Sequence, residues 1–145
     1  MDDHYALAAA IAEGLAEVAW PEAVEVAARR RTRLRAEAIT TTQIVVSPSA
    51  HAELVEARGV YREQRSVDVA VIGRLGGDEA AEEERLGALA RVKQTARRAV
   101  RTLAIAGAEY YETAEEANPF RPELAEEKGV YLAVLRTTWL AWEAA

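Results

Sequence analysis

The chain has 145 residues, of which half are apolar and 29% are charged, a balance typical of a folded globular protein rather than a disordered one. It contains no cysteine, which excludes disulfide bonds, thiolate metal sites and cysteine catalysis. The formal net charge of −6 argues against general nucleic-acid binding, because proteins that bind polyanions are usually basic. The length suits a single domain over residues 1–145 with a substantial core.

The first predicted element is a helix over residues 3–18. Leu7, Ile11 and Leu15 recur every four residues and form one apolar stripe on a helix. Pro21 ends the segment, because the residue before a proline is pushed out of the helical region.

An alternating pattern over residues 24–34 favours a strand that is unusually basic at its end. On a strand, every second side chain lies on one face, and four arginines share that spacing: Arg29, Arg31, Arg33 and Arg35. A helix remains the alternative, since alanine and arginine both form helices well.

Two further strands are predicted before the middle of the chain. Residues 40–47 are β-branched and apolar, and Pro48 is expected to stop that strand. Residues 49–59 are expected to form a connection with one helical turn. Residues 60–75 alternate regularly and predict a long strand that ends at the Gly76-Gly77 pair.

Residues 78–103 carry the strongest helix signal in the chain. Asp78 is a suitable N-cap, and acidic residues fill the first turns while basic residues fill the last, as the helix dipole favours. The predicted buried stripe consists of Leu86, Leu89, Val92, Ala96, Val100 and Leu103.

The remaining segments are a short strand over 108–113, a loop over 114–129 and a closing strand over 130–142. The closing strand is apolar on both faces, so both need cover, from this chain or from a partner. The fold class expected is therefore α+β: a mostly antiparallel sheet of four to five strands, packed by an N-terminal helix and a long central helix.

No catalytic, cofactor or metal site is expected. His4 and His51 have no partners at the spacing of a triad or metal site. Glu82, Glu83 and Glu84 are consecutive, so on a helix their side chains diverge. No apolar run approaches the roughly 20 residues of a membrane span, and no membrane partner is expected.

The candidate interface residues are the four arginines together with Tyr131, Trp139 and Trp142. The arginines could be solvated or paired within the chain, pair with acidic groups of a neighbouring subunit, or contact nucleic acid. The aromatic residues could fill the core or lie at a subunit interface, where tyrosine and tryptophan are enriched.

The order of segments resembles that of the tail terminator, tail completion and minor tail proteins of tailed phages. The likeness rests on a basic strand followed by an apolar one (VEVAARRRTRL, TTQIVVSP), an alternating strand leading into an acidic-start helix (YREQRSVDVAVIGRL, DEAAEEERLGALARV), and the closing segments YYET, NPFRPEL and VYLAVLRTTWLAW. These stretches span roughly residues 24–142.

The resemblance implies a non-enzymatic virion structural protein, made in the host cytoplasm, that forms an oligomeric ring, expected to be a hexamer. Such a ring ends the tail tube or joins it to the head, contacts tube and connector proteins, and leaves a bore for DNA. The family supplies no catalytic residues to carry over. The alternative expectation is a small adaptor module that uses the same sheet to bind a different protein.

Overall fold

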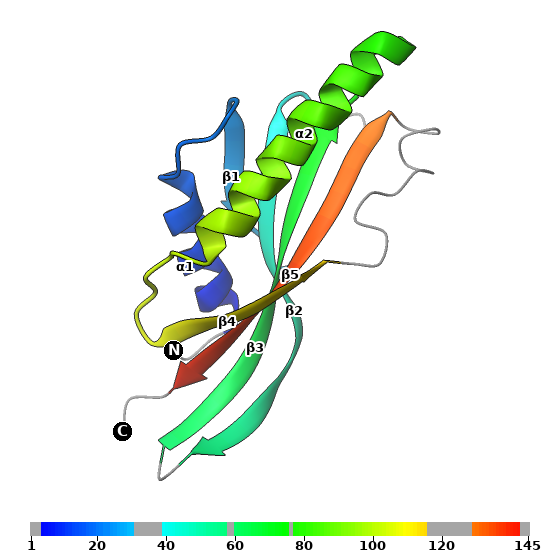
Figure 1. Cartoon of the computed structure of the whole chain (residues 1–145). Helices are drawn as coiled ribbons and strands as arrows, with labels where there is room; N and C mark the ends of the chain where they lie inside the picture. The colour runs from blue at the N-terminus through cyan, green and yellow to red at the C-terminus, as the bar shows by residue number, and fades with distance from the viewer. Residues whose placement is uncertain (1–3, 31–38, 58–59, 76, 116–128, 143–145) are drawn as a thin grey trace.

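The computed structural model describes residues 4–30, 39–57, 60–75, 77–115 and 129–142, with the backbone alone for 50–57, 60–63, 115 and 142. Two helices and five strands follow one another along the chain (Figure 1): α1 His4–Ala16, β1 Val24–Ala28, β2 Thr42–Ala57, β3 Val60–Arg74, α2 Glu79–Val100, β4 Ala108–Glu115 and β5 Val130–Trp142. The predicted α+β class, with an N-terminal and a long central helix, is confirmed.

All five strands form one sheet in the order β1-β2-β3-β5-β4. The β1–β2 pair is parallel and the other three pairs are antiparallel, so the expected mostly antiparallel sheet is present. The closing strand β5 lies between β3 and β4. It pairs with β3 over its whole length, from Val130 opposite Arg74 to Trp142 opposite Arg62. The most apolar strand of the sequence therefore takes an interior position.

Strand β2 is much longer than the sequence predicted. The prediction that Pro48 stops this strand is wrong, and so is the expected helical turn after it, because the strand continues to Ala57. A proline is tolerated on an edge strand, where its missing N–H can face away from the ladder. β1 ends opposite Val46, so no described strand pairs with this side of β2 at Pro48. A register shift follows between Pro48 and Ala50.

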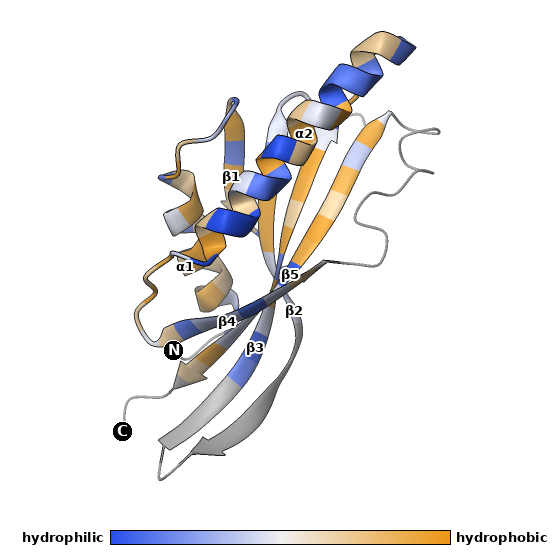
Figure 2. Cartoon of the chain, viewed as in Figure 1, coloured by the Kyte–Doolittle hydropathy of each residue, from blue (hydrophilic) through white to orange (hydrophobic). Residues whose placement is uncertain are grey.

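Both helices contribute to one hydrophobic core on the same face of the sheet. α1 contributes Leu7, Ile11 and Leu15, which have no exposed surface, as the four-residue spacing predicted. The members of the predicted α2 stripe that are fully buried are Leu89, Val92, Ala96 and Val100. Figure 2 shows apolar strands lying behind a helix whose other side is polar.

The closing strand is buried on both faces, as its composition predicted. Tyr131, Leu135 and Trp139 belong to the core under the helices. Val130 and Leu132 alternate with them and belong to a second cluster, together with Ile39, Val45, Ala70 and Ile72. The division of β5 into two apolar faces is therefore the one expected from its period-two pattern.

Local interactions fix the two ends of α2. At the start, the Asp78 carboxylate accepts a hydrogen bond of 2.8 Å from the Ala81 amide, which is an N-cap contact. At the other end, the helix stops at Val100, three residues before the predicted Leu103. Gly107 then takes a positive φ of 81° in the turn before β4, a backbone conformation that glycine adopts readily.

Candidate subunit interface

The described part of the arginine segment alternates up to Arg29 and then turns. Arg29 lies just after β1, and its amide donates to the Val46 carbonyl over 2.9 Å, which extends the ladder by one bond. The next guanidinium, Arg30, lies 4.6 Å from the centre of the Tyr5 ring on α1, a cation–π contact. Arg31, Arg33 and Arg35 lie outside the described residues.

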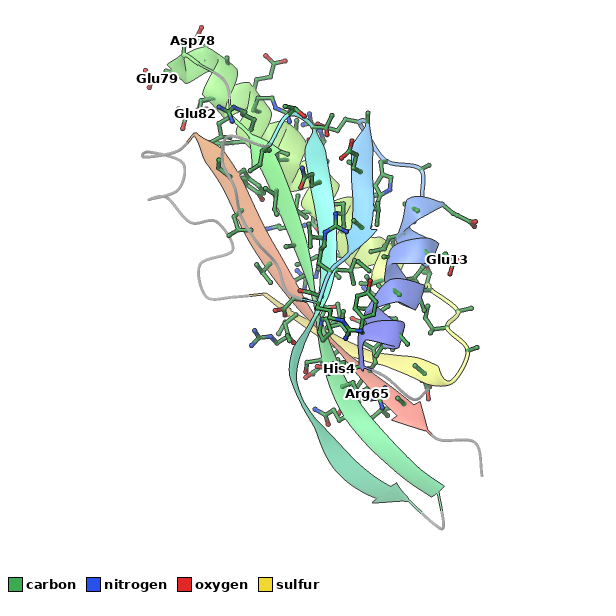
Figure 3. All side chains as sticks on the ribbon, turned by 180° about the vertical axis from the view of Figure 1, so that it is seen from behind. His4, Glu13, Arg65, Asp78, Glu79 and Glu82 are labelled. Carbon is green, nitrogen blue, oxygen red and sulfur yellow. The ribbon has the colours of Figure 1, made fainter. Side chains whose placement is uncertain are left out.

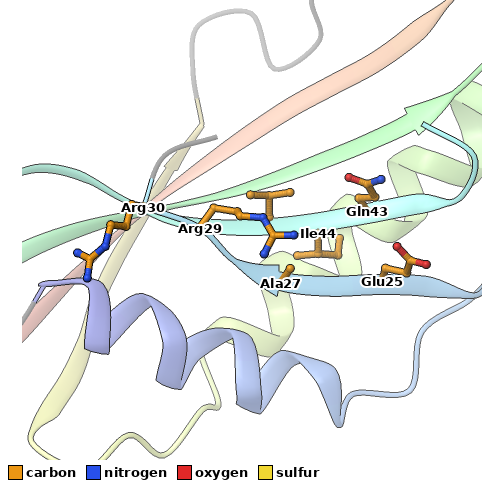
Figure 4. Close-up of a pocket in the computed structure, with 7 residues that line it drawn as sticks. Glu25, Ala27, Arg29, Arg30, Gln43 and Ile44 are labelled. Carbon is orange, nitrogen blue, oxygen red and sulfur yellow. The ribbon is translucent and has the colours of Figure 1, made fainter. Parts of the chain in front are cut away.

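A hollow of about 460 Å³ lies beside β1, on the face of the sheet where the side chains of Glu25, Ala27 and Arg29 lie (Figure 4). Glu25 and Ala27 line it from β1, Arg29 and Arg30 line it from the residues just after β1, and Gln43, Ile44 and Val45 line it from β2. The lining thus combines one carboxylate with two guanidinium groups. The hollow is therefore a mixed polar surface rather than a uniformly basic groove of the kind that follows a nucleic-acid backbone.

The two candidate interface aromatics whose side chains are described lie in the core of the single chain. Tyr131 is 4% exposed and Trp139 is fully buried. The Trp139 indole N–H donates to the Thr137 hydroxyl over 2.8 Å, and its ring meets Tyr110 edge-on, with centroids 5.6 Å apart. Core filling thus accounts for both residues. The backbone of Trp142 pairs with Arg62, and its side chain lies outside the described atoms.

The two outer edges of the sheet differ in their freedom to pair. On the side opposite β3, no described strand pairs with β2 beyond Val46. The other edge, β4, is interrupted by a register shift between Tyr110 and Glu112, which leaves Tyr111 as an extra residue with 59% of its surface exposed. A bulge of this kind hinders pairing with another strand. Strand β2 has register shifts of its own, between Pro48 and Ala50 and between Ala50 and Glu53, so its regular unpaired stretch runs from Glu53 to Ala57.

A polar cluster absent from the sequence predictions joins α2 to the start of the sheet. Arg85 donates two hydrogen bonds to the Glu22 carboxylate, at 3.0 and 3.3 Å, and the Thr42 hydroxyl donates a third at 2.6 Å. Partial burial raises the pKa of Glu22, but the bonds from Arg85 and Thr42 outweigh it, so the pKa lies below its ordinary value. The three residues are far apart in sequence, and their spacing carries no local signal of the cluster.

The histidines show no catalytic arrangement in the part of the chain that is described. The His4 ring nitrogen Nε2 lies 2.8 Å from the Ser66 carbonyl oxygen, so this side chain ties the start of α1 to β3. The side chain of His51 lies outside the described atoms. Among the described residues, no three histidine, aspartate or glutamate side chains are placed to hold a metal ion. No described helix is long and apolar enough to cross a membrane.

The surface of α2 is the most strongly patterned charged surface in the described chain. Asp78, Glu79 and Glu82 lie at its free end (Figure 3), and this end extends beyond the strands it packs on (Figure 1). The opposite end carries basic residues, of which Arg98 and Arg101 are exposed. The sequence predicted this polarity as a match to the helix dipole.

The sequence matches no family model, and a comparison with curated proteins gives no match.

Proposed function

We propose that this protein is a non-enzymatic structural subunit of a tailed phage that forms a homo-oligomeric ring at the neck or tail end. Such a ring ends the tail tube or joins it to the head. The order of helices and strands supports this role, since the described segments on which the phage resemblance rests form helices and strands in the expected order, although the basic strand ends at Ala28 and Arg29 and Arg30 lie outside it. Pro48 and the residues after it depart from the expectation by lengthening β2.

The observation that carries the proposal is the open outer edge of β2. From Ser47 to Ala57 this edge has no neighbouring strand within the described chain. The register with β3 is irregular from Pro48 to Glu53 and regular from Glu53 to Ala57. Unpaired backbone groups on a regular edge bind a strand of another chain readily. Pro48 and the register shifts after it interrupt the first half of this edge, so the stretch from Glu53 to Ala57 is the part that the proposal assigns to pairing with another copy.

The direct test of this role uses the tail-tube protein encoded nearest to this protein's own gene. The tube protein is polymerised alone, with this protein, and with an unrelated protein of similar net charge, and the lengths of the tubes are measured by electron microscopy. We expect shorter tubes that carry a ring at one end only when this protein is present. Unchanged lengths and bare ends would overturn the proposal, and so would the absence of any tail gene nearby, which would favour the adaptor alternative.

A further inference from the structure

The exposed side of α2 carries a regular stripe that no described part of the chain covers. Its members recur at alternating spacings of three and four, and all are exposed: Glu84, Gly87, Arg91, Gln94, Arg98 and Arg101. This spacing places all six residues along the polar face of the helix. At 1.5 Å per residue, the stripe is about 26 Å long. A face of this length and regularity suits contact with a second helix.

Charge is segregated along this stripe. Acid lies at the N-terminal end, where Glu83 and Glu84 are both exposed, and base lies at the C-terminal end, at Arg98 and Arg101. Within the stripe no acidic residue stands three or four positions before a basic one, which is the spacing that stabilises a helix from within. The helix dipole favours such charges in the first and last turns, which accounts for Arg98 but not for Glu84. Arg91 attracts the Glu22 carboxylate of the same chain. Glu83 and Glu84 are therefore the part of the pattern that the described chain leaves unexplained.

Gly87, in the middle of the stripe, also lacks a reason within the chain. A glycine inside a helix destabilises it relative to alanine. A Cβ atom at this position would meet only the Arg91 guanidinium, at an ordinary contact distance of 3.8 Å. Glycine also permits the close approach of another backbone. The open space above Gly87 fits a neighbouring helix that lies against the stripe.

We infer that the two ends of this stripe join copies of the chain head to tail, with the acidic end of one α2 beside the basic end of the next. The inference rests on the oligomer in the proposed function and adds to the β2 edge a second contact between its copies. Glu84 of one copy then faces Arg98 of its neighbour, and Gly87 leaves room for the end of the neighbouring helix at Arg101. A closed ring needs two different complementary patches on each subunit, and the two ends of α2 provide them.

The free position of the acidic end makes this contact accessible. The first turn of α2, which carries Glu79 and Glu82, extends past the strands (Figures 1 and 3), and contacts with the rest of the chain begin at Arg85 and Leu86. A neighbour can thus reach Glu83 and Glu84 without disturbing the core. Because these charges are exposed, the attraction is screened by salt, and association is expected to weaken as ionic strength rises.

Complementary charge reversal tests the inference. One variant carries Glu83→Lys with Glu84→Lys, and the other carries Arg98→Glu with Arg101→Glu. Each alone should associate at least about ten-fold more weakly than the wild type, because its two ends carry the same charge. An equimolar mixture should recover association in sedimentation velocity, since each variant then complements the other. Glu13→Lys with Glu17→Lys, an exposed pair at the C-terminal end of α1, is the matched control and should associate normally.

A cysteine pair tests the head-to-tail order. The natural chain has no cysteine, and positions 84 and 98 lie about 21 Å apart on one helix, too far to bond within a chain. Oxidation of the variant with Glu84→Cys and Arg98→Cys should give a ladder of linked copies on a non-reducing gel. The inference would be overturned if the linked product stopped at the dimer. It would also be overturned if the variant formed an oligomer in solution and no disulfide-linked product appeared on the gel.

The two failures are distinguishable. If the wild type assembles and the reversed variants assemble equally well, the α2 contact is refuted and the proposed ring is not. The same conclusion follows if the wild type assembles and the mixture of the two variants does not recover association. A wild type that stays monomeric, alone and with tube protein, removes both.

Discussion

The Glu22–Arg85 pair offers the sharpest test of how α2 is held to the sheet. Replacing Glu22 by glutamine keeps the shape and one acceptor oxygen but removes the charge. The carboxylate accepts two hydrogen bonds from Arg85 and one from Thr42, and the side chains of Glu22 and Arg85 are 25% and 33% exposed. Exposed ion pairs contribute about 0.2–1 kcal/mol, and hydrogen bonds to charged groups about 1.5–3 kcal/mol. We expect a loss of about 1 kcal/mol at neutral pH, since part of the hydrogen bonding remains.

The pH dependence of this loss follows from the lowered pKa of Glu22. The folded state binds the proton less readily than the unfolded state, whose pKa is about 4.3. The contribution of the charge is therefore complete above the unfolded pKa and disappears as the pH falls through the folded pKa. Urea unfolding of the wild type and Glu22→Gln should give curves that are separated at pH 7 and that converge as the pH falls below the folded-state pKa of Glu22.

Arg85→Met is the matched partner variant. The double mutant should lose less stability than the sum of the single losses, because each single change removes the same contact. A difference between wild type and Glu22→Gln that is equal at pH 7 and at low pH would refute the argument. Strict additivity of the two changes would show that the contact does not stabilise the fold.

Two further pairs of substitutions test the packing. Gly73→Ala should lower stability by about 1–3 kcal/mol, because its Cβ would lie 2.4 Å from the Leu89 side chain, whereas Gly87→Ala should raise the unfolding free energy by about 0.5–1 kcal/mol; thermal unfolding measures both, and equal shifts would contradict the described packing. Thr137→Val should cost about 1–3 kcal/mol, because it removes the acceptor of the buried Trp139 N–H. In the Trp139→Phe background the same change should cost clearly less in urea unfolding, and an undiminished cost would mean that this hydrogen bond is unimportant.

Local sequence patterns predicted most of the fold because they reflect local physics. The capped helix after Asp78 and the two-faced closing strand are both present, since capping, dipole and period-two burial act over a few residues. The length of β2 was missed because the effect of Pro48 depends on whether a neighbouring strand needs its N–H. That depends on where β1 ends, which is a property of the sheet rather than of the segment.

The candidate interface was less predictable than the fold. Tyr131 and Trp139 fit either a core or a subunit contact by composition, and only the layer formed by the two helices places them inside. The Glu22–Arg85 cluster joins positions 63 residues apart, so no spacing rule could find it. The charge polarity of α2 was visible in the sequence, but which residues are exposed became clear only from the packing of the helix on the sheet.

Native mass spectrometry of the wild-type protein, from dilute to concentrated solution and with and without its tail-tube protein, tests the central claim most directly. We expect a single closed oligomer of defined copy number to replace the monomer as concentration rises or when tube protein is added. A monomer under every condition would contradict the account of this chain as a ring-forming structural subunit.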